Sequence, residues 1–253
     1  MNRSDYTKGL VSVSFRAHSP REILHAMKNL GLSVIEWGSD IHAPYNDAER
    51  LCEIAALQKE FGIRCSSYGT YFKFFKTPIE ELEGYILAAK QLGTDRLRIW
   101  CGPKSGADMT PEERDELLVL CRKAEAMARA HGVILCLECH KKTFTERLSD
   151  ALWLMEQINS PHFRMYWQPF QWLSVEENLT YAKAIAPYTE YLHVFNWKGE
   201  DMLPLGDALE EWRSYLAAFS TPRTLLLEFM PDGRIESLPV EAEALTRITG
   251  GEK

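Results

Sequence analysis

Eight short runs of β-branched and aliphatic residues recur along the 253-residue chain, and each is followed by a longer segment with helical periodicity. The strand-like runs lie at 10–15, 33–37, 63–68, 96–100, 133–138, 163–168, 190–195 and 223–229. Helices are expected near 20–30, 46–61, 77–92, 111–131, 146–158, 174–187, 206–219 and 236–249. This alternation is typical of βαβ units around a parallel sheet. Eight units predict a closed (β/α)8 barrel, with an open doubly wound sheet as the alternative.

Helix start and stop signals agree with this pattern. Start signals are Ser19-Pro20, Thr77-Pro78 and Thr110-Pro111, and glycines that end helices are Gly31, Gly62, Gly93 and Gly132. Each start pairs a capping side chain with a proline in the first turn. No low-complexity tract or Gly/Ser linker divides the sequence, so residues 1–253 are expected to form one domain.

Composition narrows the classes of partner. The net charge of -7 argues against a surface that binds nucleic acid, because phosphate neutralisation needs a basic face. The N-terminal stretch lacks the apolar core of a signal peptide, and no later stretch approaches the length of a membrane span, so we expect a cytoplasmic protein. Cys136 and Cys139 are spaced like a CxxC motif, but strand alternation predicts that their sulfur atoms lie on opposite faces.

Polar side chains gather at the predicted carboxyl ends of the strands, where barrel enzymes carry their sites. They are Glu36 on the second strand, Arg98 and Trp100 on the fourth, Glu138 and His140 on the fifth, Gln168 on the sixth, His193 on the seventh and Glu228 on the eighth. In the fifth strand Glu138 shares a face with Cys136, while Leu137 lies on the other face. Glu138, His193 and Glu228 are therefore expected to point into the barrel.

Two buried carboxylates are costly unless a cation, a metal ion or a proton neutralises them. Together with a histidine, Glu138 and Glu228 form a set of oxygen and nitrogen donors that suits Mn²⁺, Mg²⁺, Co²⁺ or Zn²⁺. The alternative is that each glutamate pairs with a basic residue, for which Arg98 is the candidate. The residues alone leave both explanations open.

Four segments resemble the xylose isomerase-like TIM-barrel superfamily. They are "GLSVIEWGSDIHAP" at the second strand, "VILCLECH" at the fifth, "YLHVFNWKG" at the seventh and "TLLLEFMP" at the eighth. Members typically hold one divalent metal ion with Glu, Asp, His and Glu from the fifth to eighth strands. The resemblance implies Glu138, Gln168, His193 and Glu228 as metal ligands, with Gln168 in place of the Asp. Gln171 stands where a histidine often lies.

The resemblance also implies a chemistry: an isomerase or epimerase that acts on a sugar or sugar phosphate, with Glu138 and Glu228 exchanging a proton with the substrate. A dehydratase on the same site is the nearest alternative. A sugar-binding barrel that lost strong metal binding through Gln168 is another. An apurinic endonuclease would be expected to have more than the seven histidines of this chain, and a basic groove.

Further residues are predicted to contact the substrate. They are Glu36, His42, Trp100, His140, Gln171 and Lys198. Trp167, Trp172 and Trp197 also lie near strand ends, where an indole can stack on the carbon face of a sugar. Gly233-Arg234 is a weak candidate for binding a phosphate group. Whether the chain forms a homo-oligomer is left open by the sequence.

Overall fold

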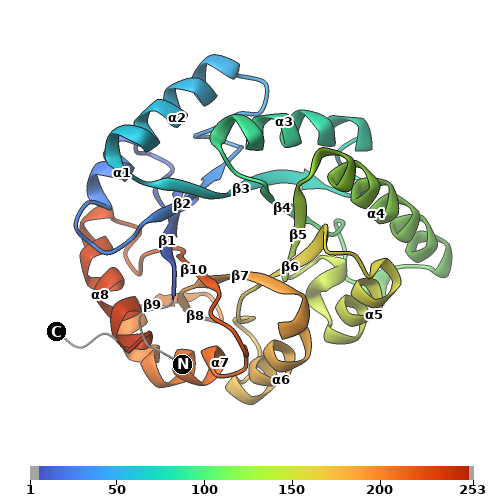
Figure 1. Ribbon diagram of the computed structural model, residues 1–253. Coiled ribbons are helices and arrows are strands. Elements are labelled where there is room, and N and C mark those ends of the chain that lie inside the picture. The colour runs from blue at the N-terminus through green and yellow to red at the C-terminus, as the bar shows by residue number, and fades with distance from the viewer. Residues whose placement is uncertain (1–5, 251–253) are drawn as a thin grey trace.

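The computed structural model describes residues 6–250, and eight of its strands form one closed parallel barrel (Figure 1). The barrel strands are β1 (Lys8–Val11), β2 (Val34–Gly38), β3 (Arg64–Lys73), β4 (Arg96–Trp100), β5 (Ile134–Glu138), β6 (Phe163–Trp167), β7 (Thr189–Val194) and β10 (Thr224–Leu227). Around the barrel the order is β1-β10-β7-β6-β5-β4-β3-β2. The predicted (β/α)8 architecture is confirmed, while both ends of the predicted domain, 1–253, lie outside the described residues.

Helices surround the barrel as an outer ring, one after each barrel strand (Figure 1). They are α1 (Pro20–Ala26), α2 (Ala48–Phe61), α3 (Leu82–Leu92), α4 (Pro111–His131), α5 (Leu148–Ile158), α6 (Val175–Ile185), α7 (Leu209–Leu216) and α8 (Leu238–Ile248). Capping boxes start α1 at Ser19 and α4 at Thr110, as the sequence predicts. Thr77 differs, because its hydroxyl accepts from the Lys73 amide and α3 begins only at Leu82.

The first strand was expected at 10–15, but β1 covers Lys8–Val11 and Ser12–Phe15 form a 3-10 helix. Two further corrections concern the mouth of the barrel. The third strand was expected to end at residue 68, but β3 continues to Lys73 and carries Tyr71 to the rim. A short antiparallel hairpin of β8 (Asn196–Lys198) and β9 (Asp201–Leu203) follows β7 and was not predicted. Its turn contains Gly199 at φ 58°, a conformation that favours glycine.

Side chains divide between two apolar layers as strand alternation requires. Val34, Cys136 and Leu226 belong to a small buried cluster contributed by strands around the whole barrel, which places it in the barrel interior. Leu137 and Cys139 belong to the larger core between strands and helices. The two cysteines therefore face opposite ways, as predicted. No helix within residues 6–250 is long and apolar enough to cross a lipid bilayer.

Candidate active site

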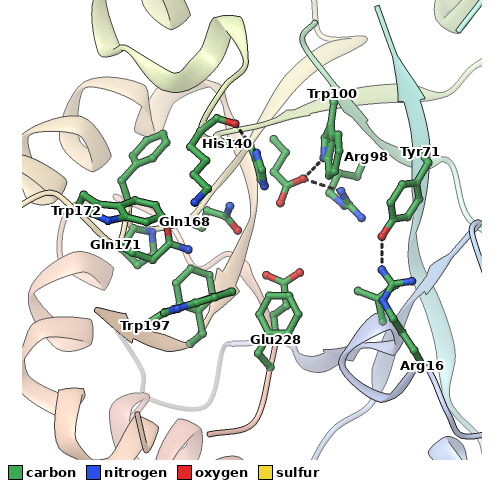
Figure 2. Close-up of a pocket in the computed structure, with 17 residues that line it drawn as sticks. Arg16, Tyr71, Arg98, Trp100, His140, Gln168, Gln171, Trp172, Trp197 and Glu228 are labelled. Carbon is green, nitrogen blue, oxygen red and sulfur yellow. Dashed lines mark hydrogen bonds and ion pairs between the residues drawn. The ribbon is translucent and has the colours of Figure 1, made fainter. Parts of the chain in front are cut away.

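A cavity of about 220 Å³ opens at the carboxyl ends of the strands (Figure 2). Glu138 and Glu228 lie at its floor. Its walls are largely aromatic, formed by Tyr71, Trp100, Phe170, Trp172, Phe195, Trp197 and Phe229. Basic and amide side chains complete the lining, namely Arg16, Arg98, His140, Lys141, Gln168 and Gln171. The cavity thus combines acidic groups below with flat apolar faces around them.

Four side chains from separate strand ends meet at the floor. The Nδ1 atom of His193 lies 3.2 Å from Gln168 Oε1, 3.5 Å from Glu138 Oε1 and 3.4 Å from Glu228 Oε2. Glu138, His193 and Glu228 each offer one possible metal-ligand atom, and these three atoms lie within 4.8 Å of one another. A single ring nitrogen can donate a proton to only one of these three oxygens. The carboxylate oxygen that does not receive this proton needs a proton of its own or a different positive partner.

Hydrogen bonds to nearby backbone atoms orient Gln168 and Glu228. The side-chain amide of Gln168 donates to the Cys139 carbonyl at 3.0 Å, so its oxygen is left facing His193. The Glu228 amide donates to Val194 at 3.0 Å, which continues the β7 pairing past the end of β10. Phe229 has φ 58°, a left-handed conformation that is unusual for a bulky residue, and its amide donates to the Ser14 hydroxyl. The chain turns sharply there, immediately after Glu228.

Arg98 forms a buried ion-pair network beside the floor. Its Nε atom lies 2.9 Å from Glu36 Oε1 and its Nη1 atom lies 2.6 Å from Glu138 Oε2. The Trp100 indole donates to the same Glu138 oxygen, as the dashed lines of Figure 2 show. The ion-pair alternative thus applies to Glu138. It does not apply to Glu228, since among the described residues no Arg or Lys nitrogen lies within 4.0 Å of that carboxylate.

The two glutamates of the floor differ in their pKa values. Burial acts to raise the pKa of Glu138, but Arg98 and His193 outweigh it and hold that pKa well below its usual range. Burial raises the pKa of Glu228 to about 7, aided by the nearby Glu138 charge and opposed by His193. At neutral pH Glu138 is therefore ionised, while Glu228 is divided between its two forms.

The pKa values of His193 and Glu36 are shifted in opposite directions by their mutual attraction. Burial alone would lower the pKa of His193, but Glu228, Glu138 and Glu36 raise it to about 10. Burial would raise the pKa of Glu36, but Arg98 and His193 lower it to about 2. In the absence of a metal ion, protons on His193 and Glu228 compensate the buried carboxylate charges.

The same charges fit a divalent cation. Glu36, Glu138 and Glu228 are three buried carboxylates, and Arg98 is the one guanidinium that contacts them among the described residues. With His193 neutral and the carboxylates ionised, two negative charges remain, which one divalent ion balances. Carboxylate, amide and imidazole donors are all suitable ligands. The residues present therefore suit a metal ion held by Glu138, Gln168, His193 and Glu228.

The cavity contains some of the predicted substrate contacts and leaves others out. Trp100, His140 and Gln171 line it, and the His140 ring stacks on Trp100 with centroids 4.9 Å apart. His42 is buried elsewhere, bonded to the Ser12 hydroxyl and the His18 carbonyl. It therefore holds the loop after β2 and does not reach the cavity.

Three other expectations change with the structure. Glu36 is fully buried behind the floor, so it contacts Arg98 and His193 and not the cavity. Lys198 is exposed and pairs with Glu211 outside the cavity. Trp167 packs into the helix layer against Trp212.

Arg234 bonds to Glu236 and, like Gly233, is absent from the cavity wall, so the phosphate candidate is not part of this site.

Sequence reasoning missed Tyr71, Arg16 and Lys141, which line the mouth. Tyr71 was missed because the third strand was predicted to be too short. The aromatic run from 71 to 75 was the available signal. Lys141 directly follows the predicted His140, and its ammonium lies 3.8 Å from the centroid of the Trp172 ring. Arg16 bonds to Asp40 and Tyr71 at the opposite side of the opening.

Comparison with curated proteins identifies one type of relative. The chain is 25% identical over 130 residues to a 3-dehydroshikimate dehydratase of Bacillus anthracis. This match covers 51% of the present chain and 46% of the relative, so the chain aligns with about half the length of that protein.

Solved structures show the same fold along nearly the whole chain. A probable 3-DHS dehydratase from Bacillus anthracis has TM-score 0.77 at 18% identity, with 95% of this chain and 98% of that one covered. The IolI protein with a bound zinc atom has TM-score 0.78 at 14% identity, with coverage of 96% and 98%. D-Psicose 3-epimerase of Clostridium cellulolyticum has TM-score 0.65 at 12% identity, with coverage of 96% and 95%.

A family model described as "Xylose isomerase-like TIM barrel" matches residues 24–243, which is most of the chain. The structural relatives named above include an epimerase and a probable dehydratase, so the same barrel supports more than one reaction. The chain belongs to the xylose isomerase-like TIM-barrel family.

Proposed function

We propose that this protein is a metal-dependent isomerase or epimerase that moves a proton at a carbon next to a carbonyl group of a sugar or sugar phosphate. The observation that carries the proposal is the convergence of three oxygen atoms on Nδ1 of His193 at the cavity floor. A carbon acid of this kind needs a base close to it and positive charge near the carbonyl oxygen.

Glu138, Gln168, His193 and Glu228 would hold the metal ion. When bound, a divalent cation supplies Lewis-acid stabilisation of negative charge on a substrate oxygen. Gln168 is the neutral member of this set, and its oxygen is oriented by the hydrogen bond from its amide to Cys139. The chain itself supplies the remaining chemistry.

Glu228 is the better proton-transfer group of the two glutamates. Among the described residues no Arg or Lys nitrogen lies within 4.0 Å of its carboxylate, so Glu228 is not held by a fixed cation and can accept and return a proton. Glu138 is held as an anion by Arg98 and Trp100, so it is a weak proton donor. We therefore assign proton removal chiefly to Glu228 and give Glu138 the part of an anchored carboxylate, which would take part in proton transfer only in an epimerisation, where the proton returns from the opposite face. The sequence-based prediction gave both glutamates a part in proton transfer.

The walls of the cavity suit a carbohydrate. Trp100, Trp172 and Trp197 line the space above the floor (Figure 2), and apolar aromatic walls favour the carbon faces of sugars. His140 and Gln171 add hydrogen-bonding groups to the same space.

A dehydratase is the second candidate. The asymmetry between Glu138 and Glu228 favours reactions that need one proton-transfer group, and loss of a hydroxyl β to a carbonyl is such a reaction. The relative named a 3-dehydroshikimate dehydratase supports this candidate over the part of the chain that it matches. A barrel that only binds sugar would not need the proton-transfer group that Glu228 provides.

Solvent exchange tests the proposal. The protein, loaded in turn with Mn²⁺, Co²⁺, Zn²⁺ or Mg²⁺, is incubated in D₂O with a panel of ketoses and sugar phosphates, and deuterium incorporation is followed by NMR and mass spectrometry. We expect exchange at a carbon next to the carbonyl, and a fall of about 10²- to 10⁴-fold in E228Q. The control is E156Q, because Glu156 is exposed on α5.

The outcomes separate the candidates. Exchange with formation of a new sugar supports the isomerase or epimerase. Release of water with a new ultraviolet absorbance from a conjugated product supports the dehydratase. No exchange with any metal ion and any member of the panel, or equal rates in wild type and E228Q, contradicts the assignment of Glu228.

A further inference from the structure

Glu36 is a buried carboxylate that the proposed chemistry leaves without a task. It lies on β2, is 0% exposed and does not line the cavity. Its Oε2 atom accepts a hydrogen bond from Ser67 at 2.9 Å, and its Oε1 atom faces Arg98 Nε at 2.9 Å. A buried charge with this many partners is held in one orientation. That orientation points one oxygen atom toward His193.

The contact with His193 is made on the side of the ring away from the floor. Glu36 Oε2 lies 3.6 Å from His193 Nε2, whereas the floor oxygens surround Nδ1. Within residues 6–250, Nε2 is fully buried and has no hydrogen bond of normal length. Glu36 is thus the acceptor placed for a proton on Nε2. A proton on Nε2 leaves the Nδ1 lone pair free for a metal ion.

Strand β3 leaves room for the Glu36–Arg98 pair. A Cβ atom added at Gly69 would lie 2.5 Å from Glu36 Oε1 and 2.9 Å from Arg98 Nη2, closer than carbon atoms ordinarily approach. Gly69 has no positive φ, so a left-handed conformation does not explain the glycine. The space it leaves is occupied by the two charged side chains. The absence of a side chain at position 69 of β3 therefore makes room for the Glu36–Arg98 pair.

Charge gives Glu36 a second task. The four donor residues at the floor include two carboxylates, and one of them, Glu138, is already paired with Arg98. Those two carboxylates and Arg98 together carry a single negative charge. Glu36, on the other side of the same guanidinium, raises this to two, which matches a divalent ion. The Glu36 carboxylate thus offsets the positive charge of Arg98.

We propose that Glu36 is a positioning residue of the metal centre, an inference that rests on the metal site of the proposed function. It holds the proton of His193 on Nε2, directs the Nδ1 lone pair to the metal ion and balances the positive charge of Arg98. Carboxylates that orient a metal-bound histidine in this way commonly change metal affinity about 10- to 100-fold.

The first test uses wild-type protein, so it does not depend on a variant that folds. Protein labelled with ¹⁵N at histidine is loaded with Zn²⁺, and the protonation of each His193 ring nitrogen is read from long-range ¹H–¹⁵N correlations. We expect a proton on Nε2 and zinc on Nδ1, with the Nε2 proton shifted downfield by its carboxylate acceptor. Zinc on Nε2, or no binding of zinc at all, would overturn the inference.

The second test compares E36Q with S67A. In E36Q the charge is lost and the size is kept, whereas S67A removes the Ser67 hydrogen bond to Glu36 and keeps the carboxylate. Zn²⁺ and Co²⁺ affinities are measured by competition with a chelator. We expect a loss of about 10- to 100-fold in E36Q together with a changed visible spectrum of bound Co²⁺, and a much smaller loss in S67A. Equal affinity and an unchanged Co²⁺ spectrum in E36Q would contradict the inference.

These readouts are independent of turnover. If wild-type protein binds Zn²⁺ through Nδ1 and E36Q weakens it, Glu36 has the proposed task even when no ketose exchanges deuterium. In that case only the proposed reaction fails. If exchange occurs and E36Q binds metal as well as wild type does, the reaction stands and the task of Glu36 is wrong.

Discussion

In the proposed metal site, Gln168 would decide how strongly a metal ion is held. Its oxygen lies 3.2 Å from His193 Nδ1, in the same group as the oxygens of Glu138 and Glu228. An amide oxygen carries only a partial charge, so it is a weaker ligand than a carboxylate. Its amide hydrogen bond to Cys139 nevertheless fixes the oxygen toward the floor. A neutral ligand in this place favours a readily exchanged metal ion over a tightly bound one.

Replacing this amide by a carboxylate tests that interpretation. We expect Q168D to bind Zn²⁺ and Mn²⁺ more tightly, by roughly one to a few kcal/mol, because a full negative charge replaces a dipole beside the cation. Competition titration with a chelator measures the change. Q171D is the matched control, since Gln171 lines the cavity outside the group around Nδ1. An equal gain in both variants would show that general charge, not ligation at position 168, is responsible.

At the scale of elements, the strands that supply the floor of the cavity deliver their functional groups together because they end at the same level of the barrel. β5 ends at Glu138, β7 carries His193 one residue before its end, and Glu228 follows β10 directly. β3 is the exception, because it continues to Lys73 and contributes a side wall to the cavity in Tyr71. β2 contributes Glu36 from below. The strand lengths therefore decide which residues reach the cavity and which support it.

The fit between β3 and its neighbours can be tested at Gly69. We expect G69A to lower the free energy of unfolding by about 1 to 3 kcal/mol, because the added methyl group forces the buried Glu36–Arg98 pair apart. G206A is the control, since a Cβ there meets no atom within 4 Å and Gly206 does not have positive φ. Urea unfolding of both variants, in metal-free buffer, measures the difference. Similar values for the two variants would contradict the proposed packing.

At the scale of the whole molecule, closure of the barrel assembles the charges. Glu36, Arg98, Glu138, His193 and Glu228 come from five different strands or strand ends, separated by tens of residues in sequence. Below them the barrel interior is filled by apolar side chains such as Val34 and Leu226. This apolar layer keeps the charges in a low dielectric, which makes their mutual interactions strong.

The stability of the metal-free protein should consequently depend on pH. Glu228 has a folded pKa of about 7, above the ordinary value of 4.5, so the folded state binds the proton more tightly and stability falls as pH rises through this interval. His193 has a folded pKa of about 10 against an ordinary 6.5, so its contribution falls in the same direction between those values. Glu36, with a lowered pKa of about 2, contributes stability that is lost below pH 4.5.

We therefore expect metal-free protein to be most stable near pH 5 and to lose stability toward pH 9. Saturating Zn²⁺ should raise the unfolding midpoint most at the alkaline end, because the metal ion replaces the lost protons. Thermal unfolding after chelator treatment, with and without added Zn²⁺, measures both effects. A metal-free profile that is flat between pH 5 and 9 would show that His193 and Glu228 are not coupled as described.

Much of this protein was predictable from local patterns. Eight alternations of strand and helix indicated the barrel, and the period of two placed Cys136 inside and Leu137 and Cys139 outside. The same period correctly grouped Glu138 with the inward face. Such inferences succeed because they depend on residues close in sequence, whose side chains are oriented by backbone geometry alone.

Only the tertiary structure decided what each polar residue contacts. Glu36 lies on β2 and His42 follows that strand, yet the first supports His193 from below and the second bonds within its own loop region. Arg98 pairs with Glu36 and Glu138 but not with Glu228. This difference separates the pKa values of Glu138 and Glu228. The sequence by itself determined the barrel and the inward-facing groups at the strand ends. Which of those charges pair was decided by distances across the closed barrel, because electrostatic interactions act through space and not along the chain.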